Sequence, residues 1–281
     1  MLSLSPTGFN VLEALSVYRF LTPAQMLAVG VTRDKSHLYD TLKRLSRQRG
    51  APVGKMDFGV VPKLGRLAVV YYLKAKGAEI IAEALRVDST DIPYAKAKVM
   101  YHNDYFHRRD CVDFQIMARQ WAQEIGADMD FYHSYYDHTG ANRGGHAGKL
   151  SPKTRVWTGT QALVPDGVFK ITMPDNTQRL FVMELSRGMD TKRVVNQLQT
   201  HLFALEKKAF STAFDYPHHH RIVWVFDTEN ALKVVQERAA SLPDCEKWLP
   251  AAFFKTIADI EQGFFEGWRG ILPNSPIKPL F

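Results

Sequence analysis

The chain has 281 residues, of which 46% are apolar and 23% are charged. This balance is typical of a globular protein with one large or two modest domains, and it disfavours disorder, collagen-like repeats and coiled coil. Two cysteines, Cys111 and Cys245, are too few for a disulfide framework or a cysteine-rich zinc site, which favours a reducing cytoplasm.

Targeting signals are missing from the pattern as well. No apolar run reaches the roughly 20 residues that span a bilayer, and the first ten residues lack the basic flank and apolar stretch of a secretion signal. We therefore expect a cytoplasmic protein without a membrane segment.

The formal net charge of +7 is unevenly distributed. Residues 1–86 hold 13 Lys+Arg against 6 Asp+Glu, whereas residues 87–281 hold 23 of each. The whole excess therefore lies in the first third of the chain, where it would attract a polyanion such as DNA. A domain that is merely soluble and rich in basic residues is the alternative.

The first thirty residues predict two helices. One face of the first carries apolar side chains at helical spacing, namely Phe9, Leu12, Leu15 and Tyr18. Thr22 is a suitable N-cap and Pro23 a suitable first residue for a short helix that extends to Ala28. Gly30 then ends that helix.

A third helix is predicted after Thr32, which can cap it, with Leu38, Leu42 and Leu45 on its buried side. A helix, a short helix, a glycine-containing turn and another helix form a helix-turn-helix arrangement. The other side of the third helix and the residues just before it carry side chains that can reach base edges and phosphates: Arg33, Lys35, Ser36, His37, Tyr39, Lys43, Arg44 and Arg47.

Two strands, Val53–Gly59 and Leu67–Leu73, are predicted next, joined by a hairpin tip at residues 61–66. Lys63 and Arg66 at this tip would contact the sugar-phosphate backbone. A closing helix begins near Lys76. The segment therefore predicts a winged helix that binds double-stranded DNA, with a protein-binding winged helix as the alternative.

The polar stretch 87–94 marks a domain boundary, which divides the chain into residues 1–92 and residues 93–281. A helix is predicted over 97–125 and a strand over Asp128–Tyr136. The basic loop His138–Lys153 is rich in glycine, but its glycines match neither a P-loop nor a dinucleotide fingerprint.

The second domain is predicted to be an α/β core. A strand starts at Leu163, a turn follows at 174–177, and the partner strand is Arg179–Ser186. A helix over 191–210 leads to the apolar strand Arg221–Phe226, which is typical of a buried strand in a mixed sheet. The helix Asn230–Ser241 follows.

Two acidic residues on the paired strands are candidate metal ligands. Asp166 lies at the start of one strand, and Glu184 lies within an apolar run of the other, where a carboxylate is costly to bury unless it binds a cation or accepts hydrogen bonds. The pair could share Mg²⁺ or Mn²⁺ and promote phosphodiester cleavage. Alternatively, Asp166 is a turn residue and Glu184 is a salt-bridged strand residue.

These motifs carry a resemblance to known nucleases. Pro165-Asp166-Gly167, a hairpin and then Glu184-Leu185-Ser186 resemble the PD-(D/E)XK core of restriction-endonuclease-like proteins, and Gln197 lies on a helix that resembles the next motif helix. The overall architecture resembles the plasmid replication-relaxation and MobC-type mobilisation relaxase family. The resemblance implies an α/β (α+β) fold, in which a winged helix-turn-helix precedes a nuclease-like mixed sheet.

The same resemblance implies a relaxase-like nickase that uses Mg²⁺ or Mn²⁺ at an origin of transfer or replication of a plasmid or mobile element. Other mobilisation or replication proteins, and a second copy of the chain, are the implied partners. The nuclease pattern expects a lysine where this chain has Ser186. Ser186 could hold a water, and Lys170, Lys192 or Arg193 could supply the missing positive charge.

Three alternatives remain open. Tyr132, Tyr135 and Tyr136 could include a tyrosine nucleophile, although no cluster of alternating histidines accompanies them. The run 218–220 of three histidines could capture a metal, although an exposed polar run before a strand is the simpler interpretation. Finally, the chain could be a non-catalytic DNA-binding regulator or accessory factor with a degenerate nuclease fold.

Overall fold

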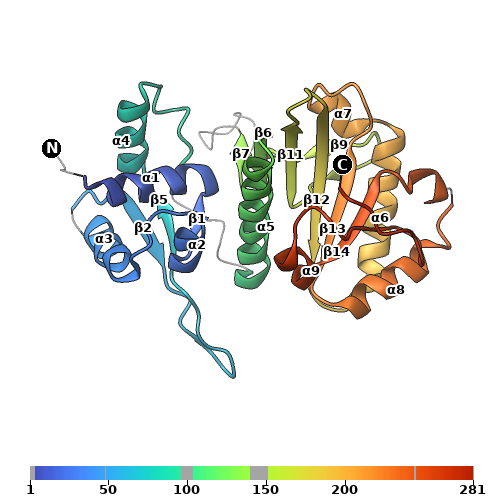
Figure 1. The fold of residues 1–281 in the computed structure, drawn as a ribbon, viewed down its shortest axis with the longest axis horizontal. Helices are drawn as coiled ribbons and strands as arrows, with labels where there is room; N and C mark the ends of the chain where they lie inside the picture. Colours follow the sequence, from blue (N-terminus) through green and yellow to red (C-terminus); the bar gives the residue numbers. More distant parts are fainter. Residues whose placement is uncertain (1–3, 48, 96–103, 140–150, 244, 281) are drawn as a thin grey trace. The chain divides into compact units, whose positions relative to one another are not determined.

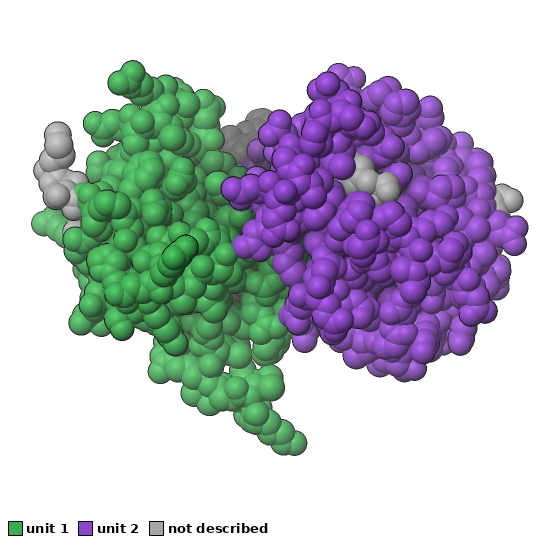
Figure 2. Space-filling view, in the orientation of Figure 1, with its two compact units in different colours: residues 1–116 green, residues 117–281 purple. Residues whose placement is uncertain are grey.

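The computed structural model describes residues 4–47, 49–95, 104–139, 151–243 and 245–280. The chain divides into two compact units, residues 1–116 and residues 117–281, which Figure 2 shows in different colours, and Figure 1 shows the helices and strands of both. This division falls inside one helix, α5 (Tyr105–Glu124). Both units mix helices with strands, so the prediction of an α+β fold is confirmed.

Unit 1 (residues 1–116) combines helices with a small antiparallel sheet. Its elements before α5 are α1 (Pro6–Tyr18), β1 (Phe20–Leu21), α2 (Pro23–Ala28), α3 (Lys35–Arg47), β2 (Val53–Met56), β3 (Val60–Val61), β4 (Gly65–Arg66), β5 (Val70–Leu73) and α4 (Ala75–Leu85). The strands β1, β5 and β2 form the sheet in that order, and the β3–β4 ladder lies in the hairpin that joins β2 to β5.

Local capping explains where the first helices begin. The Ser5 side chain accepts a hydrogen bond from the Gly8 amide at the start of α1. The helix α2 begins at Pro23, as the Thr-Pro pair predicts. Its first turn is closed by a reciprocal capping box between Thr22 and Gln25. The apolar faces of α1 and α3 then pack together and bury Leu12, Leu15, Leu38, Leu42 and Leu45.

Unit 2 (residues 117–281) is built around a six-stranded mixed sheet in the order β15-β14-β13-β12-β11-β6. Its elements after α5 are β6 (Asp128–Ser134), β7 (His138–Thr139), β8 (Ser151–Pro152), β9 (Val156–Trp157), β10 (Ala162–Leu163), β11 (Gly167–Thr172), β12 (Gln178–Ser186), α6 (Thr191–Glu206), α7 (Ala209–Ala213), β13 (Arg221–Phe226), α8 (Glu229–Ala239), a 3-10 turn (Cys245–Trp248), β14 (Ala252–Thr256), α9 (Ile257–Gln262) and β15 (Arg269–Gly270).

The strands β12, β13 and β14 run parallel, whereas β11 is antiparallel to both β12 and β6. Crossover segments containing α6 and α8 connect the parallel strands and cover one face of the sheet, where Trp224, Phe226 and Phe254 belong to the buried core (Figure 1). The predicted helix over 191–210 is divided into α6 and α7, because Lys208 between them adopts a left-handed conformation with φ of 51°.

Lys255 lies on the opposite face of the sheet and is almost fully buried, with 2% of its surface exposed. Its Nζ donates to the carbonyl oxygens of Gly263 and Glu266 and lies 5.5 Å from the centre of the Trp268 ring. Burial lowers the pKa of Lys255 to about 8. This lysine therefore fastens the segment after α9 to the sheet.

Among the described residues, no helix combines the length and the apolar character that crossing a bilayer requires.

Candidate functional site

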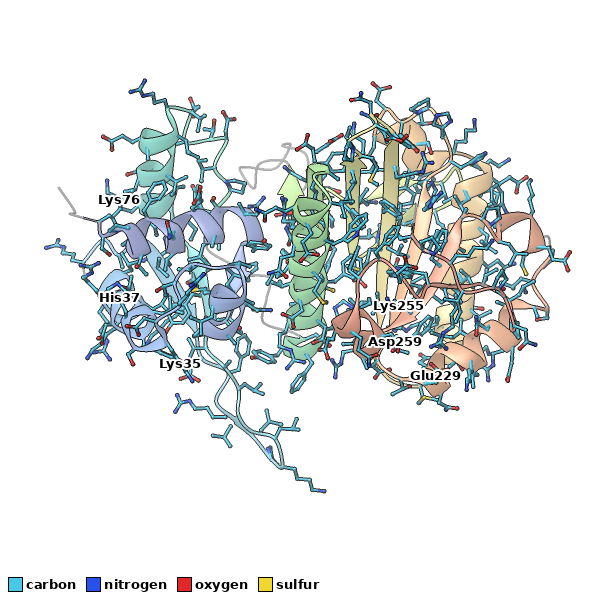
Figure 3. All side chains as sticks on the ribbon, viewed as in Figure 1. Lys35, His37, Lys76, Glu229, Lys255 and Asp259 are labelled. Atoms are coloured by element: carbon cyan, nitrogen blue, oxygen red, sulfur yellow. The ribbon has the colours of Figure 1, made fainter. Side chains whose placement is uncertain are left out.

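The residues predicted to contact DNA are all exposed on unit 1. Figure 3 labels two of them, Lys35 and His37, on the outer side of α3. The exposed set comprises Arg33, Lys35, Ser36, His37, Tyr39, Lys43, Arg44, Arg47, Lys63 and Arg66. Because the leucines of α3 fill the core, its basic side is left in solvent.

The start of α3 differs slightly from the sequence prediction. The side chain of Asp34, rather than Thr32, accepts a hydrogen bond from the His37 amide at 3.0 Å. The Thr32 hydroxyl instead accepts from the Asp34 amide at 3.2 Å. These bonds hold the first turn of α3, from which Lys35 and Ser36 project.

Two of the predicted DNA contacts also have partners within unit 1. Arg44 donates to the Ser5 hydroxyl at 3.1 Å, which links α3 to the start of α1. Arg66 forms an ion pair with Asp57 at the base of the β3–β4 hairpin. The amide of Gly59 and, after it, the Arg66 guanidinium hold the pKa of Asp57 below its usual value.

In unit 2, Asp166 and Glu184 come together across the β11–β12 pair. Gly167 lies opposite Met183, so Asp166 and Glu184 form the next pair along the two strands. Asp166 Oδ2 accepts a hydrogen bond from the Leu185 amide at 2.8 Å. Glu184 is 4% exposed, and its carboxyl group is within hydrogen-bonding contact of Asp166.

Burial and, after it, the charge of Asp166 raise the pKa of Glu184 well above its usual value. Two carboxyl groups form a hydrogen bond only when one of them keeps its proton. The raised pKa and the deeper burial of Glu184 favour it as the group that holds this proton.

Two side chains of α6 complete this acidic site. His201 Nε2 lies 2.6 Å from Glu184 Oε1, and the Gln197 side chain also bonds the Glu184 carboxyl. Burial lowers the pKa of His201 to about 3, so the imidazole is neutral. With the proton on Glu184, these contacts are all satisfied when His201 donates from Nε2 to Glu184 and Glu184 donates to Asp166.

Two of the three remaining candidates for catalysis, Ser186 and Lys170, have partners outside the acidic pair. Ser186 is buried, and its hydroxyl accepts a hydrogen bond from the Trp224 indole at 2.9 Å. Lys170 pairs with Asp130 at 2.9 Å and lies opposite Leu180, about 13 Å along the strand from Glu184. The structure therefore brings neither Ser186 nor Lys170 into contact with the acidic pair.

Positive charge reaches the acidic pair from the first turn of α6. Lys192 and Arg193 are both exposed there. Arg193 is near enough for its charge to lower the pKa of Glu184, in opposition to burial. Lys192 stays a candidate at the same helix start, whereas Arg193 has a direct electrostatic effect on the site.

His201 is a functional candidate that sequence reasoning missed. The spacing of Arg193, Gln197 and His201 is four residues in each step, which places them along one side of a helix. A polar stripe of this kind, on the helix that follows the strand of Glu184, was the available signal.

The donor set suits a hard divalent cation. Two carboxyl groups supply the oxygen ligands that Mg²⁺ and Mn²⁺ prefer, and a protein usually offers such ions only a few ligands and leaves positions for water and phosphate. Nδ1 of His201 has no hydrogen-bond partner among the described residues, so the imidazole can accept a further bond. Loss of the Glu184 proton would accompany cation binding, because a ligand must be deprotonated.

Several of the other candidate residues from the sequence are buried in the core of unit 2. Tyr132 and Tyr136 are each 6% exposed, and Tyr132 stacks on Phe169. Of the histidine run, His218 and His219 are exposed as expected, but His220 is fully buried against Phe210. Burial, then the neighbouring histidines 201 and 219, lower the pKa of His220 well below its usual value. Most of the glycine-rich loop, residues 140–150, lies outside the described residues.

Comparison with family models, with curated proteins and with solved structures finds no match to this chain.

Proposed function

We propose that this protein binds double-stranded DNA through unit 1 and nicks one strand at the acidic site of unit 2, with Mg²⁺ or Mn²⁺ as the cofactor. The observation that carries the proposal is the contact between the carboxyl groups of Asp166 and Glu184, together with the raised pKa of Glu184. Strongly perturbed carboxyl pairs are a common feature of catalytic sites.

The DNA-binding part rests on the order and surface of the elements in unit 1. The order helix, strand, helix, helix, strand, hairpin, strand is that of a winged helix, in which the last of these helices enters the major groove. Here that helix is α3, whose exposed side is basic. The hairpin that carries Lys63 would serve as the wing.

The cutting part rests on the energetic cost of the acidic pair. Two carboxyl groups that lie side by side in a buried environment are unfavourable once both are ionised. A bound divalent cation offsets that repulsion, stabilises the charge that develops on phosphate, and lowers the pKa of a bound water. Asp166 and Glu184 would hold the cation, while His201 and Gln197 orient the Glu184 carboxyl.

Arg193 and Lys192 are the candidates for binding the attacked phosphate, since both extend from the helix start next to the acidic pair. In this proposal they take the place of the lysine that the nuclease pattern expects at Ser186. The cognate DNA would be an origin of transfer or replication, as the resemblance to mobilisation relaxases implies.

A plasmid assay tests the cutting part. A supercoiled plasmid that carries the DNA flanking the gene is incubated with the protein and Mn²⁺, and the open-circular product is measured on a gel. We expect Asp166→Asn and Glu184→Gln each to reduce nicking by more than about a hundredfold. Loss of a residue that only supports a metal ligand usually costs about 10- to 100-fold, and loss of a ligand itself should cost more. Asp130→Asn is the matched control, because Asp130 pairs with Lys170 away from the site.

A binding assay tests the DNA-binding part separately. Lys35→Ala should weaken duplex binding and make the salt dependence less steep by about one unit of slope. Lys76→Ala is the control, since Lys76 is an exposed lysine of α4 that pairs with Glu79 (Figure 3). Equal effects of the two variants would contradict binding through α3.

The second candidate function is that of a non-catalytic DNA-binding regulator with a nuclease-like fold. The observation that favours it is the engagement of Ser186 by Trp224 and of Lys170 by Asp130, which keeps both side chains away from the acidic pair. Tight duplex binding without nicking in either Mg²⁺ or Mn²⁺ would select this function and refute the nickase.

A further inference from the structure

A short hairpin in unit 2 displays an exposed tryptophan. Trp157 on β9 is 63% exposed, whereas the other four tryptophans of the chain are 9% exposed or less. Tryptophans are enriched at binding interfaces, because the ring offers a large apolar face together with a polar N–H group.

The hairpin holds Trp157 outward by the geometry of its strands. β9 and β10 pair antiparallel, and Val156 and Leu163 point inward to a core that includes Val168 and Phe210. Because neighbouring residues of a strand point to opposite faces, burial of Val156 forces Trp157 into solvent.

The turn of this hairpin is also fastened at both ends. Thr158 donates two hydrogen bonds to the Gln161 carbonyl oxygen, one from its amide and one from its hydroxyl. The Gln161 side chain then donates to the Thr200 hydroxyl of α6 at 3.0 Å. Trp157 is therefore presented on a well-supported platform.

The sequence on either side of Trp157 is basic. Residues 151–163 include Lys153 and the exposed Arg155 and contain no acidic residue. β9 packs against α7, and the exposed Lys207 and Lys208 immediately precede α7, next to the exposed Glu206. An aromatic face with basic neighbours is complementary to a nucleic-acid strand, which offers both flat bases and phosphates.

The hairpin is joined to the acidic site through consecutive residues of one helix. Thr200 holds the hairpin turn, and the next residue, His201, contacts Glu184. At its other end, the hairpin leads from Leu163 to Asp166 within three residues. Both connections keep the hairpin within a few residues of the acidic site along the chain.

We propose that Trp157 stacks on an unpaired nucleobase of the DNA strand next to the cleaved position, with Arg155 contacting its phosphate. This inference rests on the proposed action on DNA, and it specifies that unit 2 binds unpaired rather than duplex DNA. In a duplex, each base is stacked on its neighbours and cannot offer a face to the indole. Trp157 thus adds a second contact with nucleic acid, distinct from α3.

Tryptophan fluorescence tests the inference on the intact chain. A single-stranded oligonucleotide of about 12 nucleotides should quench the one exposed tryptophan, and the same sequence as a duplex should not. Trp157→Ala should abolish the quenching and weaken single-strand binding about tenfold, and Trp157→Phe should keep part of the affinity. Ile277→Ala is the control, since Ile277 is another exposed apolar residue, at 69%.

The possible results separate this inference from the proposed function. Unchanged single-strand affinity in Trp157→Ala, or no quenching by the single strand, would overturn it even if α3 binds duplex and the acidic site nicks. Self-association that Trp157→Ala abolishes, without quenching by DNA, would assign the platform to a second copy of the chain and would also overturn it. Single-strand binding lost only in Trp157→Ala would support it even if no nicking is found.

Discussion

Acidification should destabilise unit 2 through His201. The imidazole is fully buried beside Glu184, and its pKa falls from an ordinary 6.5 to about 3 in the folded protein. The unfolded chain therefore binds a proton at this residue between those values, and the folded protein does not. The contribution of neutral His201 to the free energy of unfolding is therefore complete above the ordinary pKa of 6.5. It is lost as the pH falls from 6.5 toward the pKa of about 3 in the folded protein.

The size of the effect follows from the two pKa values. At about pH 5, the medium is about 1.5 pH units below the ordinary pKa of histidine, while the folded imidazole remains neutral. Each pH unit in this interval costs about 1.4 kcal/mol, so the free energy of unfolding should fall by about 2 kcal/mol relative to neutral pH. For a unit of this size, the melting temperature should fall by about 4 to 8 °C.

Urea unfolding followed by tryptophan fluorescence measures this loss in the appropriate unit, because all five tryptophans lie in unit 2. Trp224 reports on the site itself, since its ring lies 5.5 Å from His201. His201→Gln keeps a donor for Glu184 but cannot titrate, so it should lose about 2 kcal/mol less than the wild type on acidification. The raised pKa of Glu184 acts in the opposite direction in both proteins. Equal losses in the two proteins would refute the reasoning.

Three further predictions concern stability. Gly77→Ala places a Cβ 2.5 Å from the Pro52 carbonyl oxygen, so it should lower the free energy of unfolding of unit 1 by about 1 to 3 kcal/mol. Circular dichroism during thermal unfolding measures this loss. An unchanged melting temperature would contradict the close packing of α4. Asp34→Ala removes the side-chain acceptor for the His37 amide and should cost about 1 kcal/mol in the same assay. The folded pKa of Lys255, about 8, lies below its ordinary 10.5, so stability should rise with pH across that interval; Lys255→Met should remove the rise in urea unfolding, and its persistence would exclude Lys255 as the cause.

The elements of unit 1 could be predicted because local signals set them. The Thr22-Pro23 pair announces the start of α2, and the capping box forms there without help from distant residues. Leucines at helical spacing likewise identify the buried side of α3. The basic residues on the opposite side must then be exposed. The sequence pattern did not show which of two nearby residues, Thr32 or Asp34, would cap α3.

The acidic site was predictable only in part. The contact of Asp166 with Glu184 follows from the hairpin pattern, since the turn sets which residues of the two strands face each other. Strand parity put Lys170 on the correct face but said nothing of distance along the strand or of its partner Asp130. The bond from Trp224 to Ser186 joins β13 to β12 and depends on tertiary packing that no local pattern encodes.

That bond has a consequence for protein engineering. The sequence suggests a simple repair, Ser186→Lys, that would restore the residue expected by analogy with nucleases. Yet the space beyond Ser186 is filled by an indole whose ring is fully enclosed, so a longer side chain could enter only by evicting it. To enhance cleavage, a lysine or arginine should instead be introduced on the exposed side of the neighbouring helix α6.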